Sequence, residues 1–130
     1  MMNPGGGIGD HSTFSRIING ELPAVFESNE KKSPLVCFRN RLNWERVMLL
    51  VVPKKFMEQE QLWTNNILID AMNLAIKMGI DHCPEGFRIL SNFGAAAHQS
   101  QRHAHIHVVS GIAKNLLLSK IDKTIDKQQD

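Results

Sequence analysis

The stretch Gln99-Ser100-Gln101-Arg102-His103-Ala104-His105-Ile106-His107-Val108-Val109 decides the fold class and points to the chemistry of this chain. Polar and apolar residues alternate through it, and alternation with β-branched residues predicts a half-buried strand. Side chains two residues apart on a strand point to the same face, roughly 6–7 Å apart along the chain. We therefore expect His103, His105 and His107 to line one polar face, while the residues between them pack beneath.

Half of the six histidines in the chain lie on this face, which makes a purely structural explanation a poor one. Imidazole changes its charge near neutral pH and can act as a base, an acid, a nucleophile or a metal ligand. Histidine pairs are common in zinc sites, which need a further ligand from elsewhere. The candidate partners are His98 and a cluster without recognisable ligand spacing, made of Asp81, His82, Cys83 and Glu85. A metal site therefore stays open as an alternative.

The rest of the pattern predicts a small α+β domain. Turn residues and apolar alternation predict strands at residues 24–27, 35–39, 46–52, 87–90 and 103–110. Ser12 or Thr13 can cap a short helix that ends near Asn19-Gly20. A longer helix is predicted from apolar residues at helical spacing, namely Ile67, Ala71, Leu74, Ala75 and Met78, with Gly79 to end it. An antiparallel meander of strands with one long helix makes an α+β fold.

Composition narrows the class of protein. The chain has 130 residues, 42% of them hydrophobic, and a net charge of +2, which suit one globular domain with no strong attraction to nucleic acid or membrane. Cys37 and Cys83 do not make a disulfide framework, and no stretch is apolar for long enough to cross a bilayer, so we expect a cytoplasmic protein.

The chain is expected to divide into a flexible segment at residues 1–12, a domain at residues 13–113 and a tail at residues 114–130. The tail is expected to be partly helical because Leu117, Ile121 and Ile125 share a helical spacing.

Three segments of the chain resemble the histidine triad (HIT) family, and its Hint branch most of all. The family pattern of His-x-His-x-His and two apolar residues is matched by residues 103–109, and Phe87-Arg88, Asn92 and Gln99-Ser100 match the positions before it. Residues 14–24 (FSRIINGELPA) resemble the amino-terminal helix and turn of the family, and residues 51–55 (VVPKK) resemble the end of its central strand. Three segments in the same order make the resemblance specific.

The resemblance implies a fold, an assembly and roles for individual residues. It implies a HIT-like fold, which is a five-stranded antiparallel sheet with one long helix and a short amino-terminal helix, and a twofold homodimer with the long helices at its interface. It implies that His105 is the nucleophile of a nucleotidyl-histidine intermediate and that His103 and His107 assist it. The implied phosphate-binding residues are Asn92, Gln99 and Ser100, and the implied nucleoside-binding residues are Phe14, Ile17, Phe38 and Asn40.

The loop at residues 94–100 suits the phosphate of such a substrate. Gly94 and the alanines that follow it leave backbone N–H groups unobstructed, and such groups can form an anion-binding nest. Donors are needed there because negative charge builds on the phosphate oxygens during nucleophilic attack. We therefore expect this loop to hold the phosphate.

The chain departs from the family at the nucleoside end of the site. Asn40 stands where relatives carry an acidic residue that binds the ribose hydroxyls, Arg41 where an apolar residue is usual, and Met48 where a histidine falls. An amide lacks the charge that strengthens such hydrogen bonds. Ser15 stands where some relatives have a zinc-binding cysteine, so we expect no zinc and no other cofactor.

These residues predict a HIT-type nucleotide-binding hydrolase that cleaves nucleoside monophosphate derivatives such as phosphoramidates. The expected ligand is a purine nucleotide, and neither a nucleic acid nor a membrane is an expected partner. Three alternatives remain open. They are a hydrolase of dinucleoside polyphosphates, a HIT-fold protein that binds nucleotides with little turnover, and a metal-dependent enzyme that uses the histidines as ligands.

Overall fold

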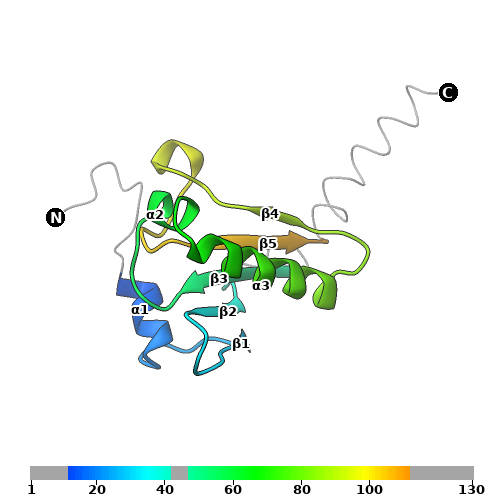
Figure 1. Cartoon of the computed structure of the whole chain (residues 1–130), viewed down its shortest axis with the longest axis horizontal. Helices are drawn as coiled ribbons and strands as arrows, with labels where there is room; N and C mark the ends of the chain where they lie inside the picture. The colour runs from blue at the N-terminus through cyan, green and yellow to red at the C-terminus, as the bar shows by residue number, and fades with distance from the viewer. Residues whose placement is uncertain (1–11, 42–46, 112–130) are drawn as a thin grey trace.

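The computed structural model describes residues 12–41 and 47–111 of the chain. Five antiparallel strands form one sheet in the order β1-β2-β3-β5-β4 (Figure 1). The strands are β1 (Phe26–Ser28), β2 (Leu35–Arg39), β3 (Val47–Pro53), β4 (Arg88–Leu90) and β5 (Ile106–Ser110). The helices are α1 (Ser12–Ile18), α2 (Gln59–Trp63), α3 (Ile67–His82) and the 3₁₀ turn η2 (Ala95–Ala97). The predicted α+β fold with a five-stranded antiparallel sheet, one long helix and a short amino-terminal helix is therefore confirmed.

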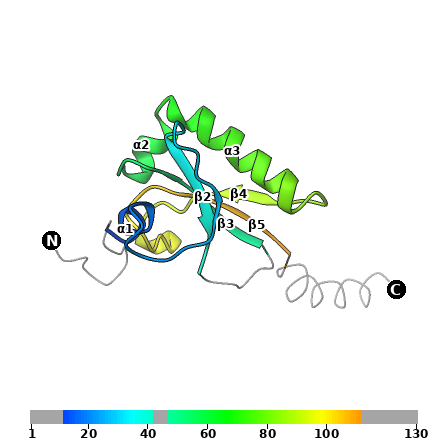
Figure 2. The same cartoon turned by 90° about the horizontal axis from the view of Figure 1, so that it is seen from below.

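Strands β2 and β3 are almost wholly apolar because helices cover both faces of the sheet. Figure 2 shows α3 on one face and α1 on the other. Side chains alternate between the faces along a strand. In β2, Leu35 and Cys37 belong to the core under α3, together with Ala71 and Ala75 of that helix. The neighbouring Phe38 belongs to a second core on the other face, with the side chains of α1. The second core forms the floor of the site described below.

The long helix starts at the predicted residue, Ile67, but runs past the predicted end. Gly79 lies inside the helix rather than after it. A glycine is needed at this position because the ring of Phe87 occupies the space that a side chain would fill. Strand β1 lies one to two residues later than the predicted residues 24–27. The short helix α2 was not expected from the sequence at all.

The strand of the histidines also starts later than predicted. It begins at Ile106 and not at residue 103, and in the β3–β5 register the partner of Ala104 would be Pro53. Proline has no N–H group to donate to β5, so the β3–β5 ladder stops before it. The N–H groups of Ala104 and His105 donate instead to Met57 O and Gln59 Oε1, both at 2.8 Å. His103 and His105 therefore lie in an irregular segment held by residues 57–59.

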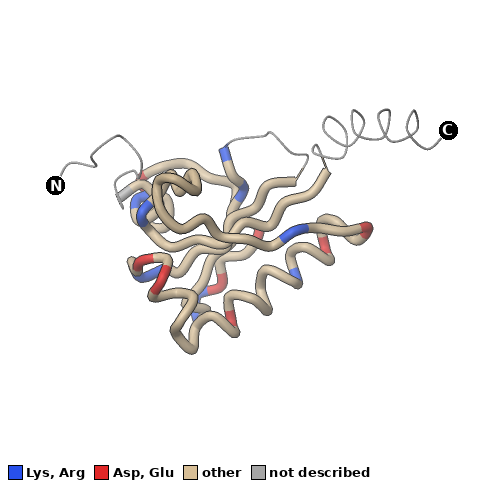
Figure 3. Tube along the Cα trace, turned by 90° about the horizontal axis from the view of Figure 1, so that it is seen from above, with Lys and Arg blue, Asp and Glu red and all other residues tan. Residues whose placement is uncertain are grey.

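Basic and acidic residues are both spread over the described trace (Figure 3). In the described residues no helix is both long and apolar enough to cross a membrane. The segments expected to be flexible (residues 1–12) and partly helical (residues 114–130) lie outside the described residues, apart from Ser12.

Candidate active site

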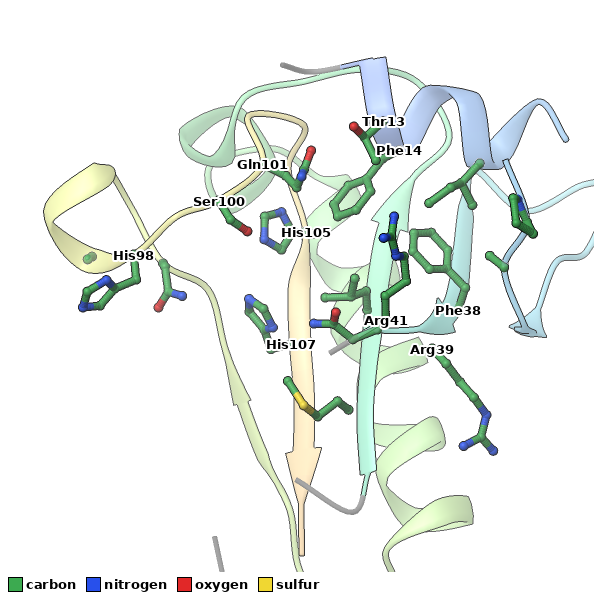
Figure 4. Close-up of a pocket in the computed structure, with 18 residues that line it drawn as sticks. Thr13, Phe14, Phe38, Arg39, Arg41, His98, Ser100, Gln101, His105 and His107 are labelled. Carbon is green, nitrogen blue, oxygen red and sulfur yellow. The ribbon is translucent and has the colours of Figure 1, made fainter. Parts of the chain in front are cut away.

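A pocket of about 860 Å³ opens on the sheet face that carries α1 (Figure 4). One wall comes from α1 and from the end of β2, and the other comes from the loop between β4 and β5. Of the predicted site residues, the lining includes His105, His107, Asn92, Ser100, Phe14, Ile17, Phe38 and Asn40. Fold and pocket thus bring together residues that lie far apart in the sequence, while His103 and Gln99 are not part of the lining.

His105 is the central titratable group of the pocket, and its ring is held in one orientation. The side chain is 2% exposed, and Nδ1 lies 2.8 Å from the carbonyl oxygen of His103. A carbonyl oxygen can only accept a hydrogen bond, so Nδ1 carries the proton and Nε2 keeps its lone pair. Burial lowers the pKa of His105 to about 4, although its hydrogen bond to the His103 carbonyl opposes the shift. The imidazole is therefore neutral at pH 7 and has one nitrogen available for nucleophilic attack.

His107 lies beside His105 in the pocket. Their ring centroids are 5.0 Å apart with an interplanar angle of 73°, and burial lowers the pKa of His107 below its usual value. It sits on β5 opposite Leu50 of β3 and Leu90 of β4, so the middle of the sheet fixes its position. Two neutral imidazoles thus face one substrate-sized space, as Figure 4 shows.

His103 does not line this pocket, although its ring lies on the same face of the sheet, where it contacts Phe14 of α1 as the ring of His105 does. The three imidazoles share this face, and two of them, His105 and His107, line the pocket. The side chain of His103 is fully buried, and Nε2 lies 2.7 Å from Pro53 O. Its ring packs between Phe14 and Phe56, at centroid distances of 6.0 and 5.5 Å. The β3–β5 ladder ends at Val51 and Ile106, so His103 lies before it in the irregular segment. Its carbonyl oxygen accepts a hydrogen bond from His105 Nδ1 and so orients that ring.

The loop that was expected to bind phosphate is held mainly by its own hydrogen bonds. Gly94 adopts a φ of +91° and its N–H donates to Gln99 Oε1 at 2.8 Å, while Gln99 Nε2 donates to Gln101 O at 2.9 Å. The N–H groups of Ala97, His98 and Gln99 donate to carbonyl groups within the loop. These four N–H groups are therefore engaged within the loop, and Gln99 shapes the loop rather than lining the pocket. Phosphate binding by this loop stays a prediction. Asn92 and Ser100 remain as side-chain donors on this wall.

The opposite wall is apolar at its base. Phe14, Ile17 and Phe38 are each less than 10% exposed and belong to the second core as well as to the pocket lining. Phe14 stands edge-on to Phe38 at 5.5 Å and to His105 at 5.2 Å. Such a slot suits a flat apolar ligand group next to His105. The three residues that depart from the family pattern, Asn40, Arg41 and Met48, also line this pocket.

Gln59 is a site-positioning residue that the sequence analysis missed. It is 1% exposed, its Oε1 accepts the N–H of His105 at 2.8 Å, and its Nε2 donates to Asn92 O at 3.0 Å. One buried amide therefore ties the backbone of His105 to that of Asn92. Next to it, the Glu58 carboxylate pairs with Arg102 of the histidine segment at 2.6 Å. The one available signal was the Glu58-x-x-Gln61 spacing of a capping box, since Glu58 N–H donates to Gln61 Oε1 at 2.7 Å.

The side chains of the described residues that could bind a metal ion do not form a metal site. In residues 12–41 and 47–111, no three His, Cys, Asp or Glu side chains come together in an arrangement that could hold a metal ion. The cluster around Asp81 includes Cys83, which is buried, and Asp81, which pairs with Lys77 at 2.9 Å. The described donors therefore do not fit a metal centre.

Comparison with known proteins gives matches across most of the chain. Residues 30–114 match the model of the HIT domain family. A 14 kDa zinc-binding protein of Brassica juncea is 30% identical over 111 residues, which cover 78% of this chain and 94% of that protein. A HIT family hydrolase from Clostridium thermocellum has a similar structure, with a TM-score of 0.67, 28% identity, and coverage of 75% of this chain and 88% of that one. A hypothetical histidine triad nucleotide-binding protein from Sulfolobus tokodaii has a TM-score of 0.57 at 27% identity, over 76% of this chain and 68% of that one.

Proposed function

The chain belongs to the HIT domain family, and from that premise we propose that it is a hydrolase of nucleoside monophosphate derivatives, with phosphoramidates as its substrate class. The observation that carries the proposal is the state of His105, a neutral imidazole whose Nδ1 is bound to the His103 carbonyl and whose Nε2 keeps its lone pair. The names of the Clostridium and Sulfolobus relatives support hydrolysis and nucleotide binding, respectively. The match is to the family as a whole, so membership of the Hint branch stays a prediction.

In the proposed reaction, His105 Nε2 attacks the phosphorus and the bond from phosphorus to the leaving group breaks. The leaving group departs with the bonding electrons and takes up a proton from solvent. The nucleotidyl-histidine that forms carries positive charge on its ring, and the His103 carbonyl stabilises that charge through Nδ1–H. Water then attacks the phosphorus, the bond to Nε2 breaks, and neutral His107 is placed to accept the proton of the water.

The two walls of the pocket suggest how the substrate is held. Asn92 and Ser100 bind the phosphate oxygens, and the slot of Phe14, Ile17 and Phe38 takes the base of a purine nucleotide. Gln99 and His103 support these contacts indirectly. Gln99 holds the shape of the loop through its hydrogen bond with Gly94 N–H, and the His103 carbonyl orients the ring of His105. Bound nucleotide would thus bridge the two halves of the site, with its phosphorus next to His105.

We also propose that the protein acts as a cytoplasmic homodimer. Helix α3 exposes Ile69, Ile76 and Ile80, which are 69%, 44% and 57% accessible. An exposed apolar stripe of this kind marks an interaction surface more often than a solvated face. Strand β4 next to it is an edge of the sheet, which can pair with the same strand of a second copy.

Turnover of adenosine 5′-phosphoramidate, followed by release of AMP, tests the proposed activity. The wild-type protein should hydrolyse it, and His105→Ala should lose several orders of magnitude in kcat while its circular dichroism spectrum is unchanged. A dinucleoside polyphosphate in a parallel assay tests the first alternative. If the wild-type protein binds AMP but turns over neither substrate, it is a nucleotide-binding protein. If a chelator removes zinc from the protein and hydrolysis stops, the metal-dependent alternative is favoured.

A further inference from the structure

The described lining of the pocket carries cationic side chains and no carboxylate. Two arginines, Arg39 and Arg41, line the pocket, and none of the described lining residues is an aspartate or a glutamate. The groups nearest to the reacting phosphate contribute no formal charge, since His105 and His107 are buried and neutral at pH 7. Any positive charge offered to a ligand by the described lining therefore comes from the arginines at the end of β2.

The two arginines differ in what they already bind. Arg39 Nε lies 2.6 Å from Glu27 Oε2, and Figure 4 shows its side chain pointing away from the pocket. In the same view Arg41 points toward the two phenylalanines that line the pocket, Phe14 and Phe38. Among the ion pairs of the described residues, none includes Arg41. Arg41 is thus a cation whose charge is available to a ligand in this pocket.

The position of Arg41 indicates which part of a ligand it would meet. It lies two residues after the end of β2, the strand of Phe38, and so belongs to the wall that takes the nucleoside. Ser100 lies on the opposite side of His105 and His107 (Figure 4), in the loop between β4 and β5 that also contains Asn92. An anionic group bound by Arg41 would therefore be attached to the nucleoside rather than to the reacting phosphate.

We propose that the preferred nucleotide carries a second phosphate on a ribose hydroxyl and that Arg41, with Asn40 beside it, binds that phosphate. The inference rests on the proposed function and names its substrate class more closely. In nucleotide-binding proteins an acidic residue suits free ribose hydroxyls, whereas an arginine suits a ribose phosphate. Here an amide and a guanidinium stand together, and both can donate hydrogen bonds to phosphate oxygens, where a carboxylate would repel them.

Calorimetric titration with three nucleotides tests the proposal. The probes are AMP, adenosine 3′,5′-bisphosphate and adenosine 2′,5′-bisphosphate, and the two bisphosphates distinguish which hydroxyl carries the second phosphate. For the wild-type protein, one bisphosphate should bind roughly tenfold tighter than AMP at low salt, which corresponds to about one charge-assisted contact, and the preference should shrink as salt is added. Arg41→Gln should bind AMP and that bisphosphate equally.

Arg39→Gln is the matched control because it removes the same charge from a neighbouring residue that already pairs with Glu27. It should keep most of the bisphosphate preference, whereas a preference that depends only on overall charge would fall equally in both variants and overturn the assignment to Arg41. A wild-type protein that binds AMP as tightly as both bisphosphates overturns the inference and leaves the proposed function standing. A protein that binds none of the three overturns both.

Discussion

Replacing Gln59 with leucine removes the buried amide that holds the backbone of His105, and the cost in stability follows from two hydrogen bonds. The N–H of His105 loses its acceptor at 2.8 Å inside the protein, and an unsatisfied buried donor costs about 1–3 kcal/mol. Asn92 O loses a donor at 3.0 Å in a partly buried place, where water can replace it, at about 0.5–1 kcal/mol. Leucine is close in size to glutamine, so no large cavity is added.

The two terms add to about 1.5–4 kcal/mol in the free energy of unfolding, and we expect a loss near the middle of that range, about 2–3 kcal/mol, for Gln59→Leu. For a domain of this size such a loss lowers Tm by roughly 8–20 °C, which calorimetry or circular dichroism measures directly. The activity should respond as well, because a shift of about 1 Å in a reacting group can cost roughly a hundredfold in rate. We expect kcat to fall by about that factor, whereas the Kd for AMP changes by less than about threefold because the base slot is untouched.

Glu60→Gln is the control for this variant, since Glu60 is an exposed neighbour on the same helix and should change neither Tm nor kcat. If Gln59→Leu keeps kcat within about twofold of wild type while Tm falls, the amide is structural and does not position His105. If neither Tm nor kcat changes, the two hydrogen bonds of Gln59 stabilise neither the fold nor the position of His105.

Three further predictions concern the charge and the surfaces of the molecule. Because the pKa of His105 lies at about 4 and the neutral ring is the nucleophile, kcat/KM should be flat from about pH 5 to 7 and should fall as the pH drops through 4; a loss centred near pH 6.5 would contradict this state. Asn40→Asp should tighten the binding of AMP in calorimetry and weaken that of the favoured ribose bisphosphate, and an equal effect on both would show that residue 40 does not contact the ribose. Light scattering should find the proposed dimer for the wild-type protein and a monomer for Ile76→Glu, and an equal mass for both would show that this face of α3 is not a dimer interface.

Strands and helices with strong local patterns could be predicted from the sequence, and those that depend on distant partners could not. Strand β2 matches its predicted residues, because its apolar run is bounded by a polar turn on one side and by charged residues on the other. The start of α3 was also correct. The five residues of α2 are too few to show a helical period, and the late start of β5 depends on Pro53, which lies 50 residues before His103 in the sequence.

The candidate site shows the same division. His105 and His107 could be placed on one face by alternation alone, but nothing local distinguishes His103, whose ring turns toward Pro53 and out of the pocket. The slot of Phe14 and Phe38 could be assigned only through the resemblance to a family, because core residues and pocket residues have the same composition. Gln59 had no assigned role because its partners are the backbone groups of His105 and Asn92, which no side-chain pattern reveals.

Capture of the covalent intermediate is the most direct test of His105 as the nucleophile. Wild-type protein is mixed with excess adenosine 5′-phosphoramidate, quenched within milliseconds in alkaline denaturant, where a phosphorus–nitrogen bond to histidine survives, and digested for mass spectrometry. The account predicts an adenylyl group on the peptide that contains the three histidines, located on His105 by fragmentation and absent from His105→Ala. Full turnover without any adduct, or an adduct on His103 or His107, would contradict it.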